Sequence, residues 1–359
     1  MRIFSIIYTI KASQKADNMG LFDYEFQLEK IKEHNPPLQR LNALIDWEMF
    51  REPIEEIFRK ERKSNAGAKP YDRLMMFKIL ILQRYYNLSD EQTEFQIKDR
   101  LSFMDFLGLE MGDRVPDEKT IWLFKDELAK AKLSEKLFVL FTQKLMEHQI
   151  VLKEGSIVDA SFVSVPRQRN TREENAQIKA GETPKSFEDN PHKKAQKDCD
   201  ARWTKKNNKV EYGYKNHINA DQRTKLITDY AVTPASTHDS QVIEEIVDQS
   251  DKVLYADSAY KSETIETYLE EQNVQSKIIK RKYKNKLLDP ADHKTNYKYS
   301  KTRVRIEHIF GAFTTWMNHA LHLKAIGLQR IESQIGLANL TYNLIRYEQL
   351  VRLQGVKAI

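Results

Sequence analysis

The sequence has almost no cysteine and no long apolar run. Cys199 is the single cysteine among 359 residues, which excludes an internal disulfide framework and a cysteine-based zinc site and fits a reducing compartment. No apolar stretch approaches the ~20 residues that a membrane-spanning helix needs, so we expect a cytoplasmic protein with no membrane partner. The sequence also lacks internal repeats, and its length is sufficient for two domains.

The N-terminus resembles a signal peptide only faintly. Residues 3–10 are largely apolar, but Lys11 and Lys15 follow them without a small-residue cleavage pattern. Met19 is a more typical starting residue for the protein. We therefore expect residues 1–18 to be a non-essential extension.

Positive charge is in excess and gathers late in the chain. The net charge of +6 and the pI of about 9.0 favour a polyanionic partner. Between Lys277 and Arg305 only Asp289 and Asp292 oppose the basic residues. These are Lys277, Lys280, Arg281, Lys282, Lys284, Lys286, Lys294, Lys298, Lys301, Arg303 and Arg305. A solvated charged loop is one interpretation. We favour a strip that faces phosphates, because the run leads directly to Glu307.

The first half of the chain has a helical pattern. Residues 46–147 contain few glycines, and the strongly apolar stretch at 71–86 predicts a buried helix. Ser89 and Gln92 form a capping-box signal for the next helix. Successive helices with short turns are compatible with a helix-turn-helix that reads DNA. Any helical domain gives the same pattern, so both interpretations stay open.

After Gly155 the pattern changes to short strands that alternate with helices. A strand at 156–165 is followed by a polar stretch at 166–208, which is too long for a turn and is expected to be mobile or partly helical. The later elements are a hairpin at 210–220 and 225–233, a helix at 240–247, a strand at 253–256, a helix at 263–271 and an edge strand at 277–280. An amphipathic helix is expected at 331–353.

Three acidic residues stand in settings that suit a metal site. Asp159 lies in the apolar strand-like run at 156–163, Asp257 ends a second such run, and Glu307 sits in a helical stretch. Taken singly, an Asp at a strand end often caps a turn, and a Glu among arginines usually makes exposed ion pairs. Jointly, two carboxylates at strand ends and a third on a helix form a hard-oxygen cage for Mg²⁺. In a basic protein that cage indicates phosphodiester chemistry.

The segments around these acids resemble the DDE transposases of bacterial insertion sequences, most closely the insertion-sequence-five family. The matching motifs are Asp159-Ala160-Ser161-Phe162, Ala256-Asp257-Ser258-Ala259-Tyr260-Lys261-Ser262 and the run from Arg303 to Gly311. Residues 212–217 and 237–240 match further landmarks in the same order, so the resemblance covers nearly all of 46–350. At Thr314 the chain lacks the basic residue that the related signature often carries.

The resemblance implies an enzyme that binds the terminal inverted repeats of its element, cleaves a DNA strand and joins the freed 3′ end to target DNA. Two Mg²⁺ or Mn²⁺ ions about 4 Å apart would activate the attacking water and hold the leaving oxygen. Asp159 is expected to bridge both ions, Asp257 to bind one, and Glu307 to close the site. The implied partners are double-stranded DNA, both element ends and target, and further copies of the chain in a homo-oligomer, in the bacterial cytoplasm and associated with the nucleoid when bound to DNA.

Several side chains are expected to contact DNA. They are Arg303, Arg305, Lys301, Lys215, Lys280, Arg281 and Lys282. Arg303 lies four residues before Glu307, so it could hold a phosphate or orient Glu307 by pairing with it. His308 and Tyr260 are accessory candidates, and a packed histidine is an equal interpretation of His308. Tyr214 could line the DNA channel or fill the core.

Two further expectations favour structural roles over functional ones. Trp316 is expected in the core, and Asp239 or Ser240 is expected to cap the helix that follows.

The order strand, hairpin, helix, strand, helix, strand and then the helix with Glu307 is that of an RNase H-like core, which the resemblance also implies. We therefore expect an α/β (α+β) fold with a mixed sheet, preceded by an all-helical domain and followed by C-terminal helices. The expected divisions are the extension at 1–18, a helical domain for DNA-end recognition at 19–150, a catalytic domain at 151–325 with a basic insertion at 277–305, and a helical segment at 326–359.

Two alternatives remain open. One is a catalytically silent relative, repurposed for DNA binding, which predicts the loss of an acid. The other is an RNase H-like nuclease that only hydrolyses DNA and needs the same three acids.

Overall fold

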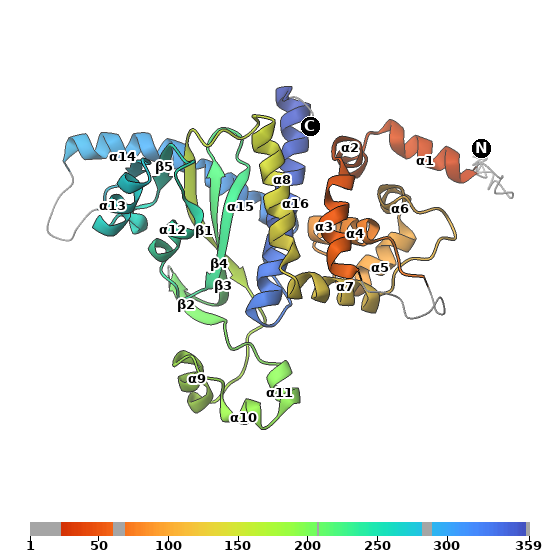
Figure 1. Cartoon of the computed structure of the whole chain (residues 1–359), viewed down its shortest axis with the longest axis horizontal. Coiled ribbons are helices and arrows are strands. Elements are labelled where there is room, and N and C mark those ends of the chain that lie inside the picture. Colours follow the sequence, from red (N-terminus) through yellow and green to blue (C-terminus); the bar gives the residue numbers. More distant parts are fainter. Residues whose placement is uncertain (1–22, 60–68, 207, 282–288, 357–359) are drawn as a thin grey trace, which may run out of the picture.

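The computed structural model describes residues 23–59, 69–206, 208–281 and 289–356. Within these parts, a group of helices lies on one side, a mixed sheet flanked by helices lies on the other, and the long helix α16 runs between them (Figure 1). The expected extension at 1–18 and the expected DNA contact Lys282 fall outside the described residues.

The N-terminal half is helical, as predicted. Its elements are α1 Asp23–Glu33, α2 Pro37–Leu44, η1 Trp47–Phe50, α3 Arg51–Phe58, α4 Arg73–Tyr86, α5 Asp90–Asp99, α6 Leu101–Leu107, α7 Glu118–Lys130 and α8 Leu133–Glu147. Asp72 caps α4 by accepting from the Met75 amide at 2.8 Å, and Asn87 ends the helix in the left-handed conformation. The predicted capping box of α5 is present between Ser89 and Gln92. Nine residues of α4 are buried, which confirms the predicted buried helix.

The sheet contains the predicted strands in the predicted order, together with one strand that was not predicted, Arg202–Lys206, in the stretch that was expected to be mobile or partly helical. Its strands are β1 Ser156–Ser164, β2 Arg202–Lys206, β3 Lys209–Asp221, β4 Ile227–Pro234, β5 Val253–Ala256 and β6 Gln275–Ile278. β1 is central: it pairs antiparallel with β3, which pairs antiparallel with β4, and it pairs parallel with β5, which pairs parallel with β6. This arrangement is that of an RNase H-like core, so the predicted fold class is confirmed. The edge strand begins and ends two residues earlier than predicted, at Gln275 and Ile278.

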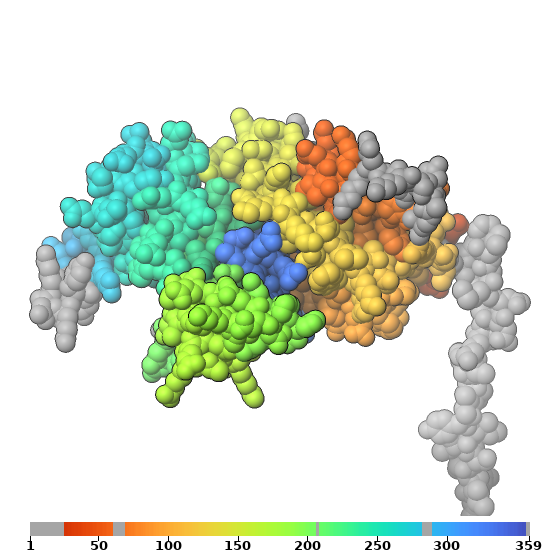
Figure 2. All heavy atoms as spheres, turned by 60° about the horizontal axis from the view of Figure 1, so that its bottom comes forward, coloured from red at the N-terminus to blue at the C-terminus, as the bar shows by residue number. Residues whose placement is uncertain are grey.

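The polar stretch after β1 is partly helical. It forms α9 Arg172–Lys179, α10 Lys185–Glu188 and α11 Pro191–Ala195, which stand out from the surface as a separate lobe (Figures 1 and 2). Glu174 holds this lobe together: it completes a capping box with Thr171, accepts from Ser186 at 2.7 Å and pairs with Lys193. The lobe has few buried side chains, of which Ile178 and Phe187 are apolar.

The remaining helices pack around the sheet. They are η2 Asp239–Val242, α12 Ile243–Ile246, η3 Ser258–Tyr260, α13 Glu263–Glu271, α14 Pro290–Arg303 and α15 Arg305–Thr315. The predicted single helix at 240–247 is therefore two short pieces. The predicted helix around Glu307 is broken at Val304, so Arg303 ends α14 while Glu307 lies in the first turn of α15.

α16, Leu328–Gln354, is not the amphipathic helix that the sequence predicts. It contacts α2, α4, α7 and α8 on one side and β4 on the other, so apolar and polar side chains are buried around most of its circumference. The buried amides make hydrogen bonds instead of facing water. Asn343 accepts from the Ile227 amide at 2.9 Å and donates to the Ile227 carbonyl at 2.7 Å, and Asn339 pairs with Asn216 at 2.8 Å. The Asn343 bonds occupy backbone groups on edge strand β4, and the Asn339–Asn216 bond ties α16 to a side chain of β3.

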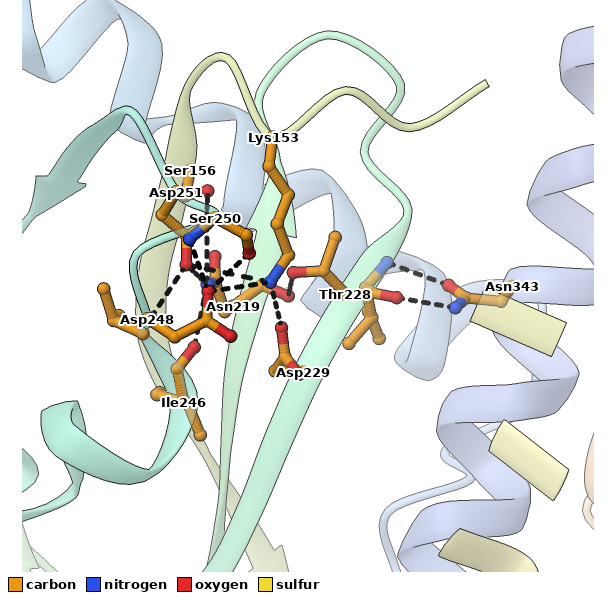
Figure 3. Close-up of polar contacts among 12 residues, drawn as sticks. Lys153, Ser156, Asn219, Thr228, Asp229, Ile246, Asp248, Ser250, Asp251 and Asn343 are labelled. Carbon is orange, nitrogen blue, oxygen red and sulfur yellow. Dashed lines mark hydrogen bonds and ion pairs between the residues drawn. The ribbon is translucent and has the colours of Figure 1, made fainter. Parts of the chain in front are cut away.

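A buried polar network lies beside the beginning of β1 (Figure 3). Lys153 is almost fully buried, and its ammonium lies 2.9 Å from Asp229 Oδ2 and 3.8 Å from Asp251 Oδ2. Asp251 is also buried; it accepts from the Ser156 hydroxyl and from the Asn219 amide at 3.2 Å. Burial raises the pKa of the Asp251 carboxyl above its usual value, and Lys153 opposes that rise. The network therefore joins β1, β3, β4 and the loop that leads to β5.

Candidate active site

Strand pairing places Asp159 and Asp257 side by side. The parallel pairing of β1 with β5 ends at Val158 and Ala256, so each Asp is the next residue along the chain, Asp159 within β1 and Asp257 just after β5. Neighbouring strands lie about 4.8 Å apart. Asp257 begins η3 and accepts from the Ala259 amide at 3.0 Å, so one of its oxygens caps that turn.

Arg303 connects Asp159 with Glu307. One guanidinium nitrogen lies 2.8 Å from Asp159 Oδ2 and another lies 3.2 Å from Glu307 Oε1. Asp159 and Arg303 are mostly buried, whereas about half of the Glu307 side chain is exposed. The cation between Asp159 and Glu307 is thus the guanidinium of Arg303. Among the described residues no group of three or more acidic, histidine or cysteine side chains is placed to hold a metal ion.

Asp239 is a fourth carboxylate, whose charge acts on Tyr260 together with those of Asp159 and Asp257, although the sequence suggested only a capping role for it. Lys215 pairs with Asp239 Oδ1 at 2.7 Å and donates to the Thr237 carbonyl at 2.7 Å. The expectation that Asp239 or Ser240 caps the next helix is wrong, because His238 is the cap and accepts from the Ser240 amide at 3.3 Å. An acidic residue within 237–240 could be seen in the sequence. Its ion pair with Lys215 of β3 could not, because that contact joins segments distant in the sequence.

Tyr260 lies among these carboxylates. Its side chain is buried, and within the described parts of the chain its hydroxyl has no hydrogen-bond partner. Burial, followed by the charges of Asp159, Asp239 and Asp257, raises the pKa of Tyr260 well above its usual value. The phenol therefore stays protonated and can donate a hydrogen bond inside the site. The neighbouring His217 is also buried, which lowers its pKa to about 4, and its ring is hydrogen-bonded to Thr233 at 2.8 Å.

Two expected site residues on α15 face a different element. Arg305 donates to the Gln222 carbonyl at 2.7 Å, and His308 Nδ1 lies 3.1 Å from the Lys225 ammonium. Both contacts are with the turn between β3 and β4. His308 is exposed, so the packed interpretation is wrong and the structure does not place the ring next to the three acids.

The other expected DNA contacts lie on or near α14. Lys301 is exposed and stacks its ammonium 4.5 Å from the centre of the Tyr297 ring. Lys280 pairs with Asp292 of α14, and Arg281 beside it is exposed. These side chains present positive charge at the edge of the sheet where β6 ends.

The structure also places Tyr214, Trp316 and Thr314. Tyr214 is a core residue whose hydroxyl donates to Asp198 at 2.7 Å, so it does not line a channel. Trp316 is 50% exposed, and the expectation that it belongs to the core is wrong. It follows α15 directly as the C-cap and projects outward. Thr314, which stands where a basic residue was expected, is exposed and donates to the Phe310 carbonyl at 3.2 Å.

None of the helices in the described parts combines the length and the apolar character needed to cross a membrane.

Family comparisons agree with the motifs around the three acids. Residues 152–344 match the model of a transposase DDE domain, and residues 26–127 match that of a transposase domain known as DUF772. A solved structure with a related arrangement is a piggyBac transposase synaptic complex with hairpin DNA. The alignment has a TM-score of 0.44 at 13% identity and covers 90% of this chain and 77% of that one. Because the DDE-domain match covers more than half of the sequence, this chain belongs to the family of DDE-domain transposases.

Proposed function

We propose that this protein is the transposase of an insertion sequence, of the insertion-sequence-five type, which cleaves its element's ends and joins them to target DNA. What supports the proposal is the placement of the three motif acids. Asp159 and Asp257 follow the last paired residues of adjacent parallel strands, and Arg303 links Asp159 to Glu307. The three acids would be both the catalytic residues and the metal ligands.

The donor set fits a hard divalent cation. Asp159, Asp257 and Glu307 offer carboxylate oxygens, which Mg²⁺ and Mn²⁺ prefer, and they would hold two ions. When bound, the ions would lower the pKa of the attacking water and stabilise the departing 3′ oxygen.

The Arg303 guanidinium can bind either carboxylates or a phosphate. Its planar fork of donors now binds two carboxylates and suits a phosphate equally well. An exchange of Arg303 onto a DNA phosphate would free Asp159 and Glu307 for the cations. Tyr260, buried and protonated, would donate its unused hydrogen bond within the same site.

The proposed partner is double-stranded DNA, both as element ends and as target. The net charge of +6 supports a polyanionic partner. The proposed phosphate contacts are Arg303, Arg305, Lys301, Lys215, Lys280, Arg281 and Lys282. Lys215 would have to leave its pair with Asp239 to make that contact. We propose a homo-oligomer as the active complex, acting in the bacterial cytoplasm on the nucleoid.

The reaction class is tested with labelled duplexes that carry the element's ends. With Mg²⁺ or Mn²⁺ we expect nicks at the end boundary, and with EDTA we expect none. A pre-cleaved end with a free 3′-hydroxyl should then give a joined product with target DNA. Cleavage without any joined product would favour the nuclease that only hydrolyses, and salt-sensitive binding without cleavage would favour the silent relative.

We also propose a division of roles: end recognition by 19–150, chemistry by 151–325 and support from 326–359. Exchanging residues 45–150 for those of a relative with different ends should transfer the end preference in a binding assay. Because α16 packs against this region, a second chimera should exchange 328–354 as well to keep the interface matched. An end preference that stays unchanged in a folded chimera would refute the assignment.

A further inference from the structure

A cavity of about 550 Å³ lies where the helical half meets the segment that leads to α16. The end of α4, the start of α5, one face of α7 and residues 318–326 line it. Asn87 fixes this junction, because its side-chain amide donates to the Asn318 carbonyl at 2.7 Å and to the His319 carbonyl at 3.2 Å. The wall is therefore built from two distant parts of the chain that are bonded to each other.

Arg84 is the unusual residue of this wall. Its side chain is 6% exposed, and within the described residues it makes no hydrogen bond or ion pair. Arg84 lines the cavity, so its guanidinium is within reach of a ligand bound there. Burial lowers the pKa of the guanidinium to about 10. A buried cation with five unused donors is costly unless something binds it.

The acids of the wall are already engaged by other cations. Asp90 accepts from Lys125 at 2.6 Å, and Asp126 pairs with Arg330 at 2.8 Å. Lys324 is exposed at the rim and has no ion pair within the described residues. The charge of Asp90 also acts on Arg84, but with Arg84 and Lys324 the cations of the wall outnumber its acids, and this excess of positive charge suits an anion.

We propose that this cavity binds a phosphate group, with the Arg84 guanidinium as the fork and Lys324 as a second cation. The guanidinium can bind two phosphate oxygens at once. The cavity volume far exceeds that of a phosphate, so the phosphate can belong to a larger molecule. No bond is made or broken at this site.

The expected source is a backbone phosphate of bound DNA, and this part rests on the proposed function. Residues 321–323 are bonded to Ser164 at the far end of β1: Ser164 donates to the Leu321 carbonyl at 3.2 Å and accepts from the Leu323 amide at 2.9 Å. Ser164 is five residues beyond Asp159, which is about 17 Å at ~3.3 Å per residue. Duplex DNA rises ~3.4 Å per base pair, so this separation along β1 corresponds to about five base pairs, which is within the reach of one duplex.

The first test is thermal unfolding of the full-length chain with inorganic phosphate, against NaCl of equal ionic strength. Phosphate should raise the Tm of the parent by roughly a few degrees at saturation. Arg84→Met should abolish that rise without lowering the Tm in NaCl, because the variant no longer buries an unpaired cation. A purely structural Arg84 would instead lower the Tm. Lys324→Met, at an exposed position, should weaken the phosphate effect, and Lys136→Met, exposed on α8 outside the cavity, should leave it unchanged.

The second test identifies the source of the phosphate from the salt dependence of binding to a duplex with the element's ends. Loss of one backbone contact reduces the slope of log K against log salt by about 0.9. A reduced slope for Arg84→Met and Lys324→Met, but not for Lys136→Met, supports DNA. Phosphate stabilisation with an unchanged slope supports the site with a free phosphate or nucleotide as its source. Absence of both effects overturns the proposal.

The two proposals fail in different ways. If the parent cleaves DNA but phosphate never stabilises it and the slopes are equal, the cavity proposal is wrong and the proposed function stands. If phosphate stabilises the parent through Arg84 but no cleavage occurs with any metal, the phosphate site stands and the proposed chemistry is wrong.

Discussion

Replacing Asp159 with asparagine is expected to lower metal-dependent cleavage at least ~1000-fold, which corresponds to about 4 kcal/mol in the barrier. Asparagine has nearly the same shape but keeps only one acceptor oxygen. In Asp159, Oδ2 accepts from Arg303 and Oδ1 accepts from the Ala160 amide, at 2.8 Å in both cases, so the variant can retain one of these two bonds. It cannot supply an anionic ligand to a divalent cation. Initial rates of nicking on a labelled end duplex in Mg²⁺ measure the effect.

DNA binding gives the matching control. Asp159→Asn removes a negative charge from a site that would face phosphates. The affinity of the variant for the end duplex should therefore equal or exceed that of the parent. Asp113→Asn, at an exposed turn before α7, should change neither property. Cleavage by Asp159→Asn within tenfold of the parent would remove Asp159 from the metal site. Adding Glu307→Gln should cost little more, because residues that act as one unit give non-additive losses.

The second large effect is expected on stability, at Lys153. Lys153→Met should lower the free energy of unfolding by about 3–5 kcal/mol, because it leaves the Asp251 carboxylate buried without a cation. Lys252→Met is the matched control one residue from Asp251; its side chain is 68% exposed, so we expect a change within ~0.5 kcal/mol. Urea unfolding followed by circular dichroism measures both.

The pH dependence and a double variant separate this mechanism from simple loss of packing. In the folded parent the pKa of Asp251 is raised above its value in the unfolded chain. Protonation of this carboxyl therefore stabilises the fold at low pH, and this stabilisation is lost as the pH rises through the folded-state pKa. Removing Lys153 raises the pKa further, so the defect should be larger at pH 8 than at pH 5. Lys153→Met with Asp251→Asn should recover part of the loss. An equal defect at both pH values, with no recovery, would contradict the electrostatic explanation.

The strand order and several element ends could be predicted from the sequence because their signals are local. β5 and α13 have the predicted bounds, and the capping box at Ser89 was visible as a residue pair three positions apart. The turn between β3 and β4 was marked by polar residues between two apolar runs. The adjacency of Asp159 and Asp257 followed from the order of the strands, although their role in catalysis stays a prediction.

Other features depended on contacts between distant segments. The periodicity of α16 predicted one apolar face, but helices on one side and β4 on the other bury Asn339 and Asn343 as well, which no local pattern reveals. The pairing of Asp239 with Lys215, 24 residues apart, displaced the expected capping role. Trp316 was assigned to the core by residue type alone, yet the end of α15 turns it outward.

The position of α16 makes the packing of the helical half depend on residues that are translated after the sheet. The helix occupies Leu328–Gln354, near the end of the chain, yet it supplies core contacts to both the first helices and β4. While the ribosome is still translating, neither half can bury the surface that α16 covers, and that surface is apolar and prone to aggregation. We therefore expect a chain that stops before residue 328 to be digested by proteases, because it lacks the helix that covers both halves.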